Sequence, residues 1–296
     1  MTTHLRLLML AAALALPSAV SAEPIERHVR VGEVERSYLV ELPAAYDGRR
    51  ALPAVLVFHG GGGAALSART QTRMSEKGHA EGFIAVYPQG SGVLSARLLT
   101  WNATTCCGYA MQHRIDEAAF VRALLDDLDA NFRVDRARIY ATGISNGGMM
   151  AYLSACALAE RFAAIAVVAG ELTTPDCRPT RPVSVLVIHG TADQNLPYDG
   201  GVGAKALARH TVRAVRFAVD LWRARDGCPD VAATERAGGL TRERHAPCVS
   251  GSEVELITVE GGGHSWPGGA RLARVLDEPS TALDATDVIW TFFARH

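Results

Sequence analysis

One serine of this sequence, inside a glycine-flanked pentapeptide, is a candidate for chemistry. Gly143-Ile144-Ser145-Asn146-Gly147 lies between a strand-like run, 138–142, and a helix-forming run, 149–153. In a sharp turn from strand to helix, the two glycines lack β-carbons that would collide, and the serine stands at the tip. Ser145 is the predicted nucleophile, and the backbone N–H of Asn146 is a predicted oxyanion donor. Chance occurrence is the alternative, because the chain has 28 glycines.

A serine hydroxyl needs a base to take its proton, and that base needs a carboxylate to orient it. Asp193 comes soon after the strand-like run 183–188, and His264 follows the run 254–259. Parallel strands end at the same edge of a sheet, so Asp193 and His264 are the predicted acid and base. Glu171 is a rival acid and Asp199 a weaker one.

Two other histidines, His59 and His189, also follow strands. Each precedes a glycine, so turn shaping or support of an oxyanion loop is the expected role. In the loop His59-Gly60-Gly61-Gly62-Gly63, either Gly61 or Gly62 is expected to supply the second oxyanion donor. A flexible turn is the alternative for this loop.

Two tryptophans lie close to these motifs. Trp266 is two residues from His264, and Trp101 lies in the segment 89–114, which has little regular pattern. We expect both rings to line the pocket for the acyl or alcohol part of a substrate, with simple packing as the alternative.

The elements that must position these residues alternate along the chain. Apolar runs without alternation are typical of strands covered on both faces, and amphipathic runs between them predict helices. The sequence therefore predicts an α/β fold with a mostly parallel sheet, helices on both faces and an antiparallel N-terminal hairpin at 26–42. The predicted central strands are 54–58, 83–87, 138–142, 164–168, 183–188 and 254–259, and the predicted helices are 64–80, 115–132, 204–225 and 285–294.

Composition limits the organisation of the chain. Its 296 residues, 48% of them hydrophobic, suffice for one large core, and we expect a single domain at 23–296. Residues 1–22 resemble a secretory signal, with Arg6, an apolar run at 7–16 and the small residues Val20-Ser21-Ala22. A membrane anchor is the alternative. Loss of this segment removes one positive charge, that of Arg6, so the formal net charge of −1 becomes −2.

That weak charge argues against two kinds of partner. Nucleic acid and anionic membrane surfaces demand clustered Lys and Arg, which the mature sequence lacks. The sequence gives no indication of the oligomeric state.

All six cysteines follow the predicted signal, and an even number favours disulfides in an oxidising compartment. Cys228 and Cys248 are expected to form a local bridge. The adjacent Cys106 and Cys107 are not expected to pair with each other, so one should bond to Cys156 and the other to Cys177, in an undecided order. A zinc site is the rival interpretation, but the spacings fit no familiar pattern. We expect no metal and no cofactor.

Five motifs in one order resemble the secreted polyhydroxybutyrate depolymerase and feruloyl esterase family. They extend through nearly the whole predicted mature chain: 58–63, Trp101-Asn102 with Cys106-Cys107, 142–149, 189–193 with Pro197-Tyr198, and 261–269. The resemblance implies an α/β-hydrolase, structural disulfides and ester hydrolysis by a Ser-Asp-His triad, here Ser145, Asp193 and His264. We expect no extra domain for binding solid polyester, so soluble hydroxyalkanoate oligomers or hydroxycinnamoyl sugar esters are the expected substrates.

Two other functions stay open at this point. A peptidase or thioesterase could use the same scaffold, because fold does not determine the leaving group. A secreted binding protein without catalysis is the third hypothesis, although a binder has no need of nucleophile, acid, base and glycine loop together. The sequence does not decide between a periplasmic and an extracellular location.

Overall fold

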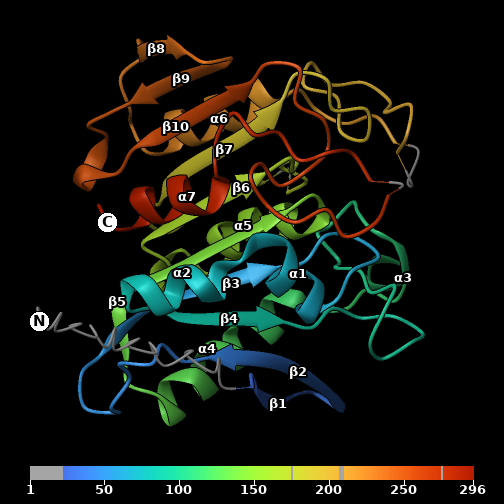
Figure 1. Cartoon of the computed structure of the whole chain (residues 1–296), viewed down its shortest axis with the longest axis vertical. Helices are drawn as coiled ribbons and strands as arrows, with labels where there is room; N and C mark the ends of the chain where they lie inside the picture. The colour runs from blue at the N-terminus through green and yellow to red at the C-terminus, as the bar shows by residue number, and fades with distance from the viewer. Residues whose placement is uncertain (1–22, 175, 207–209, 275) are drawn as a thin grey trace, which may run out of the picture.

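The computed structural model describes residues 23–296, apart from 175, 207–209 and 275, so the predicted signal at 1–22 lies outside the described residues. The described residues form one ten-stranded sheet in the order β1-β2-β4-β3-β5-β6-β7-β10-β9-β8 (Figure 1). The strands are β1 Ile25–Val31, β2 Val34–Glu41, β3 Leu52–Phe58, β4 Ile84–Pro88, β5 Val134–Ile144, β6 Ala164–Val168, β7 Ser184–Gly190, β8 Ala233–Ala237, β9 Leu240–His245 and β10 Val254–Val259.

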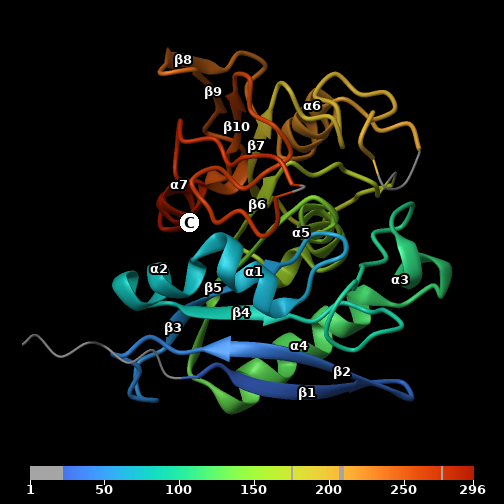
Figure 2. The same ribbon diagram turned by 45° about the vertical axis from the view of Figure 1, so that its right-hand side comes forward.

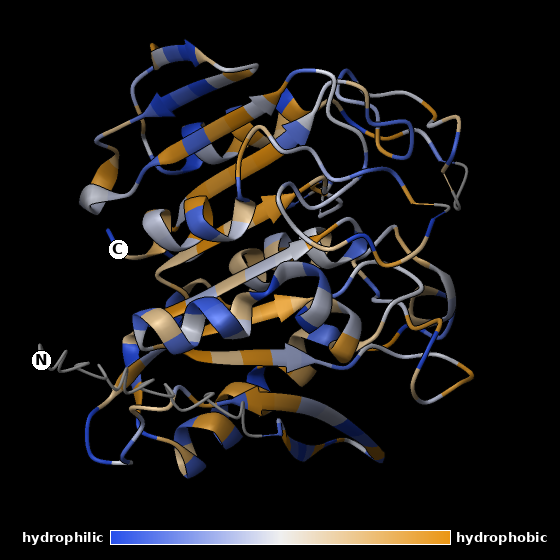
Figure 3. Cartoon of the chain, viewed as in Figure 1, coloured by the Kyte–Doolittle hydropathy of each residue, from blue (hydrophilic) through white to orange (hydrophobic). Residues whose placement is uncertain are grey.

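Six neighbouring strands in the middle of this sheet, β4, β3, β5, β6, β7 and β10, run parallel to one another. Every residue of β3, β6, β7 and β10 is buried, which explains why these runs show no polar alternation. Hydrophobic residues, orange in Figure 3, concentrate on these strands. The predicted mostly parallel sheet is confirmed, and its carboxyl edge lies on the right of Figure 1.

Helices cover both faces of the sheet (Figures 1 and 2). One face packs against α1 (Ala65–Thr72), α2 (Met74–Glu81) and α7 (Ala285–Phe293). The other packs against α4 (Glu117–Asn131), α5 (Asn146–Ala157) and α6 (Val215–Arg225). None of the helices in the described part of the chain is long and apolar enough to cross a membrane. The shorter helical segments are α3 Gly108–Gln112, η1 Ala159–Arg161 and η2 Val249–Gly251.

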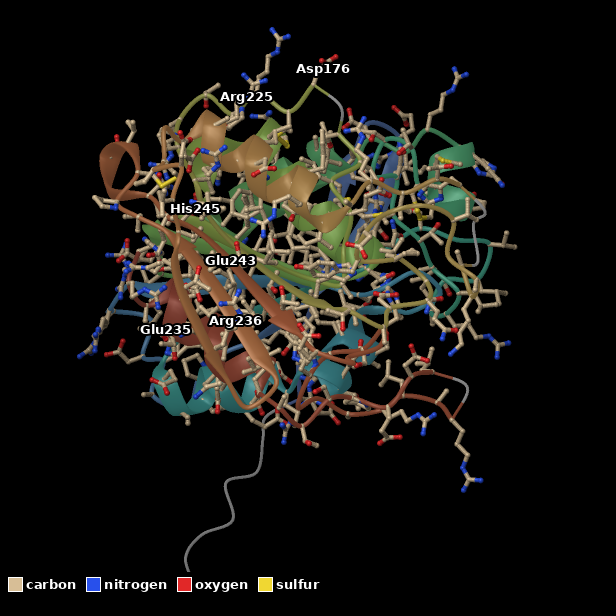
Figure 4. All side chains as sticks on the ribbon, turned by 90° about the horizontal axis from the view of Figure 1, so that it is seen from above. Asp176, Arg225, Glu235, Arg236, Glu243 and His245 are labelled. Atoms are coloured by element: carbon tan, nitrogen blue, oxygen red, sulfur yellow. A yellow bond between two sulfur atoms is a disulfide. The ribbon has the colours of Figure 1, made fainter. Side chains whose placement is uncertain are left out.

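An antiparallel hairpin closes each edge of the sheet. The N-terminal hairpin of β1 and β2 is confirmed, whereas the second hairpin, β8 and β9, has no counterpart in the sequence prediction. Every residue of β8 is exposed, so it carries no core pattern; β9 forms because β10 offers it an unpaired edge. Glu235 and Arg236 lie on the outer strand (Figure 4), where charged side chains discourage pairing with another chain.

Two predicted helices are interrupted or shortened. The segment 64–80 forms α1 and α2 because Arg73, between them, has a left-handed φ of 53° that ends the first helix. Of the predicted helix at 204–225, the described residues form α6 from Val215 to Arg225, and Val212 pairs with Gly201 through an antiparallel bridge instead.

The predicted cysteine pairing is wrong for four of the six residues. Cys156, at the end of α5, pairs with Cys177, with their Cα atoms 5.0 Å apart. Cys106 and Cys107 pair with each other across a cis peptide bond. The prediction failed because it excluded a bridge between adjacent residues. The bridge between Cys228 and Cys248 is confirmed, and it encloses the β8–β9 hairpin.

Candidate active site

Ser145 occupies the turn between β5 and α5 at the carboxyl edge of the sheet, with φ 58° and ψ −124°. Left-handed φ is unfavourable for a residue with a β-carbon, so the surrounding backbone must hold it there. The flanking glycines explain how. A β-carbon on Gly147 would overlap the carbonyl oxygens of Phe58 and His59, and one on Gly143 would collide with the carbonyl of Gly147.

The glycine loop after β3 lies directly against this turn. A β-carbon on Gly60 would lie 3.7 Å from Cβ of Ser145, and one on Gly61 would lie 3.6 Å from Cβ of Asn146. Gly62 donates its N–H to the carbonyl of Leu99 at 2.8 Å, so in this conformation it has no N–H for a substrate. The N–H of Gly61 has no acceptor among the described residues. Of the two predicted donors, the geometry therefore favours Gly61.

Trp101 is fully buried and holds this loop to the serine turn. Its backbone N–H donates to Oδ1 of Asn146 at 2.8 Å, and Nδ2 of Asn146 donates back to its carbonyl at 3.2 Å. Its indole N–H donates to the carbonyl of His59 at 2.9 Å. Trp266 is also fully buried, and its indole N–H donates to Oγ1 of Thr286. The full burial of both rings favours the alternative of simple packing, and their predicted part in a substrate pocket stays a prediction.

Asp193 and His264 meet at the same edge. Oδ2 of Asp193 lies 2.7 Å from Nδ1 of His264, and Oδ1 accepts the backbone N–H groups of Asn195 and Leu196, each at 2.8 Å. Burial of Asp193 favours its neutral form, but hydrogen bonds from His189 and His264 outweigh that effect. They hold the pKa of the Asp193 carboxyl well below its usual value. The carboxylate is therefore charged and oriented toward the imidazole.

The loops that carry these two residues touch through their backbones. A β-carbon on Gly190 would overlap the carbonyl oxygen of Gly262. That oxygen accepts the backbone N–H of Ala192 at 2.9 Å. The backbone N–H of His264 donates to Asp277, a contact that sequence reasoning missed. No motif surrounds Asp277, so its role emerges only from the folded loop.

The rival acids lie elsewhere. Glu171 pairs with Nε2 of His210 at 3.1 Å and accepts the N–H of Arg213 at 3.0 Å. Asp199 is exposed. Of the three candidate carboxylates, Asp193 is therefore the one that is hydrogen-bonded to His264. Within the described ranges, no group of three or more His, Cys, Asp or Glu could hold a metal ion.

Comparison with known proteins adds to this geometry. Residues 36–189 match the family described as "Esterase PHB depolymerase". The chain is also 33% identical over 287 residues to "Putative esterase NocK" of Nocardia uniformis subsp. tsuyamanensis, and the alignment covers 86% of this chain and 81% of that protein. The chain belongs to the PHB depolymerase esterase family. It is a carboxylic ester hydrolase.

Two more distant proteins extend the comparison. "Feruloyl esterase B" of Piromyces equi is 28% identical over 236 residues, which span 78% of this chain and 42% of that protein. The structure of a dienelactone hydrolase-like promiscuous phosphotriesterase from metagenomic libraries superposes with a TM-score of 0.61 at 19% identity. It covers 92% of this chain and 98% of that one. This likeness confirms the α/β-hydrolase fold.

In this member of the family, His59 supports the glycine loop as a neutral ring. Its side chain is buried, and Nδ1 lies 2.8 Å from the carbonyl oxygen of Gly60, which can only accept. Nε2 accepts the backbone N–H of Gly90 at 3.1 Å. Nδ1 therefore carries the hydrogen and Nε2 carries none. Burial is the main cause that lowers the pKa of His59, to about 4, and the charge of Arg36 adds to it.

This lowered pKa predicts a loss of stability in acid. Between pH 6.5 and 4, histidine is protonated in the unfolded chain but neutral in the folded one, so falling pH favours unfolding by about 3 kcal/mol. Urea unfolding of His59→Gln should lack this component, and its stability should fall less steeply over that range than the wild-type value. His113→Gln, at an exposed position, is the control and should keep the wild-type slope. Parallel curves for His59→Gln and wild type would contradict this assignment.

Proposed function

We propose that Ser145, His264 and Asp193 are the nucleophile, base and acid of a secreted serine esterase. The hydrogen bond between Asp193 and His264, at the edge of the sheet that also carries Ser145, is the observation that supports this assignment most strongly. An imidazole whose Nδ1–H is held by a charged carboxylate presents Nε2 as a proton acceptor. That is the group that a serine hydroxyl needs for attack on an ester.

The proposed reaction has two steps. His264 takes the proton of Ser145 as Oγ attacks the ester carbonyl, and then gives it to the departing alcohol as the carbon–oxygen bond breaks. Water next attacks the acyl-enzyme, with His264 again accepting a proton and returning it to Oγ of Ser145. The carboxylic acid leaves, and the enzyme regains its starting state.

The oxyanion formed in each step would bind to two backbone N–H groups. Asn146 opens α5, so its N–H lies at the positive end of a helix dipole, and Gly61 lies against it from the opposite loop. Such donors stabilise the transition state more than the ground state, and loss of one typically costs about 10²- to 10³-fold in rate.

We propose short 3-hydroxybutyrate oligomers as the substrate class. The match to the PHB depolymerase family supports aliphatic hydroxyalkanoate esters. Likeness to a feruloyl esterase supports hydroxycinnamoyl esters as a second candidate. Trp101 and Trp266 are both fully buried and offer no ring for an aromatic acyl group to stack on, which favours the aliphatic class.

Secretion is part of the proposal. Its support is the signal-like pattern at 1–22 together with three disulfides that pair all six cysteines. Disulfides persist in oxidising compartments and are rare in the cytosol.

Ser145→Ala tests the nucleophile. Loss of a triad member in such enzymes costs about 10⁴- to 10⁶-fold in rate, so the variant should be nearly inert toward a p-nitrophenyl ester. Ser95→Ala, at an exposed loop position, should match wild type. Retention of more than a few per cent of kcat by Ser145→Ala would exclude this mechanism.

A matched substrate panel tests the specificity. The wild-type protein should give a higher kcat/KM on a soluble 3-hydroxybutyrate trimer than on methyl ferulate, and no turnover of an amide matched to either ester. A preference for methyl ferulate would instead assign hydroxycinnamoyl esters as the substrate class. Faster cleavage of the amide would indicate a peptidase instead.

A further inference from the structure

His189 is a buried polar residue for which the proposed mechanism assigns no role. It is the sixth residue of β7, whose seven residues are all buried, and its side chain is 2% exposed. Removal of an imidazole from water costs free energy unless hydrogen bonds replace the lost hydration. An apolar residue would fill this strand position without that cost, so the contacts of the ring are informative.

One nitrogen of His189 makes both polar contacts of the ring. Nε2 lies 2.8 Å from the carbonyl oxygen of Leu196 and 3.3 Å from Oδ2 of Asp193. A carbonyl oxygen can only accept a hydrogen bond, so Nε2 must carry the hydrogen. Nδ1 is buried and has no hydrogen-bond partner among the described residues. The ring therefore directs a single N–H toward the acid and its loop.

The other ionisable groups around the ring are engaged elsewhere or lie farther away. Tyr198 meets it edge-on with ring centroids 6.0 Å apart, and its hydroxyl bonds to Thr258. Glu171 and Arg213 line a small hollow that the ring also borders, but they are bonded to each other through the Arg213 backbone. The nearest charge to His189 is the Asp193 carboxylate.

Asp193 thus receives hydrogen bonds on both oxygens. Oδ1 accepts two backbone N–H groups of the loop 191–198, and Oδ2 faces His264 and His189. By holding the carbonyl of Leu196 as well, His189 joins the strand to the loop that bears the acid. A carboxylate fixed in this way cannot rotate its Oδ2 away from Nδ1 of His264.

We propose that His189 is a positioning residue for the proposed reaction. Its Nε2–H holds the carboxylate of Asp193 charged and aligned on His264. The inference rests on the proposed function, because it assigns Asp193 the role of acid. His189 is buried, so its loss should lower kcat and leave KM nearly unchanged.

The test compares two side chains of similar length at position 189. His189→Gln keeps an N–H donor, whereas His189→Met has none. The Met variant should lose about 10²-fold in kcat on a p-nitrophenyl ester, the size expected for a small misplacement of catalytic groups. The Gln variant should stay within about fivefold of wild type. KM should change less than twofold in both variants.

Three results would overturn the inference: equal kcat in the Met variant and wild type, equal loss in the Met and Gln variants, or a loss in the Met variant that appears in KM alone. Isosteric Asn and Leu repeat the comparison if the Met variant does not fold. Failure of both apolar variants to fold would indicate a purely structural role and also reject it. An inactive wild-type protein would instead refute the proposed function, so the two failures are distinguishable.

Discussion

The charge on Asp193 is the feature on which the candidate site depends. A buried carboxylate is costly to hold without water, and the protein meets that cost with N–H donors on both oxygens. Two of these donors are the backbone N–H groups of Asn195 and Leu196, in the loop that also bears Asp193. The carboxylate therefore also fixes the conformation of its own loop. The hydrogen bond to His264 follows from this arrangement, because Oδ2 is left facing the loop after β10.

Close contact between backbones brings the remaining parts to the same edge. Gly147 lets the start of α5 lie against the carbonyl oxygens at the end of β3, which places Ser145 beside the glycine loop. Gly190 and Gly262 do the same for the loops of acid and base. Each contact excludes a β-carbon, so these glycines are needed for steric reasons and not only for flexibility. Hydrogen bonds between Trp101 and Asn146 then fix the first pair of loops.

Local patterns predicted what local physics determines. Unbroken apolar runs identified the buried parallel strands, and the positions of Asp193 and His264 after such strands predicted their meeting. Contacts between distant segments had no such signal. Nothing in the sequence near Cys156 indicates its partner, and β9 forms only because β10 has a free edge. The burial of Trp101 likewise depends on how the segment 89–114 folds back onto α5.

The most direct test of the triad is covalent labelling by a serine-directed phosphonate, followed by peptide mass spectrometry. The account predicts a single adduct, on Ser145, and labelling slowed at least about 10³-fold in His264→Ala but unchanged in His113→Ala. An adduct on another residue, or equal labelling rates in wild type and His264→Ala, would contradict it.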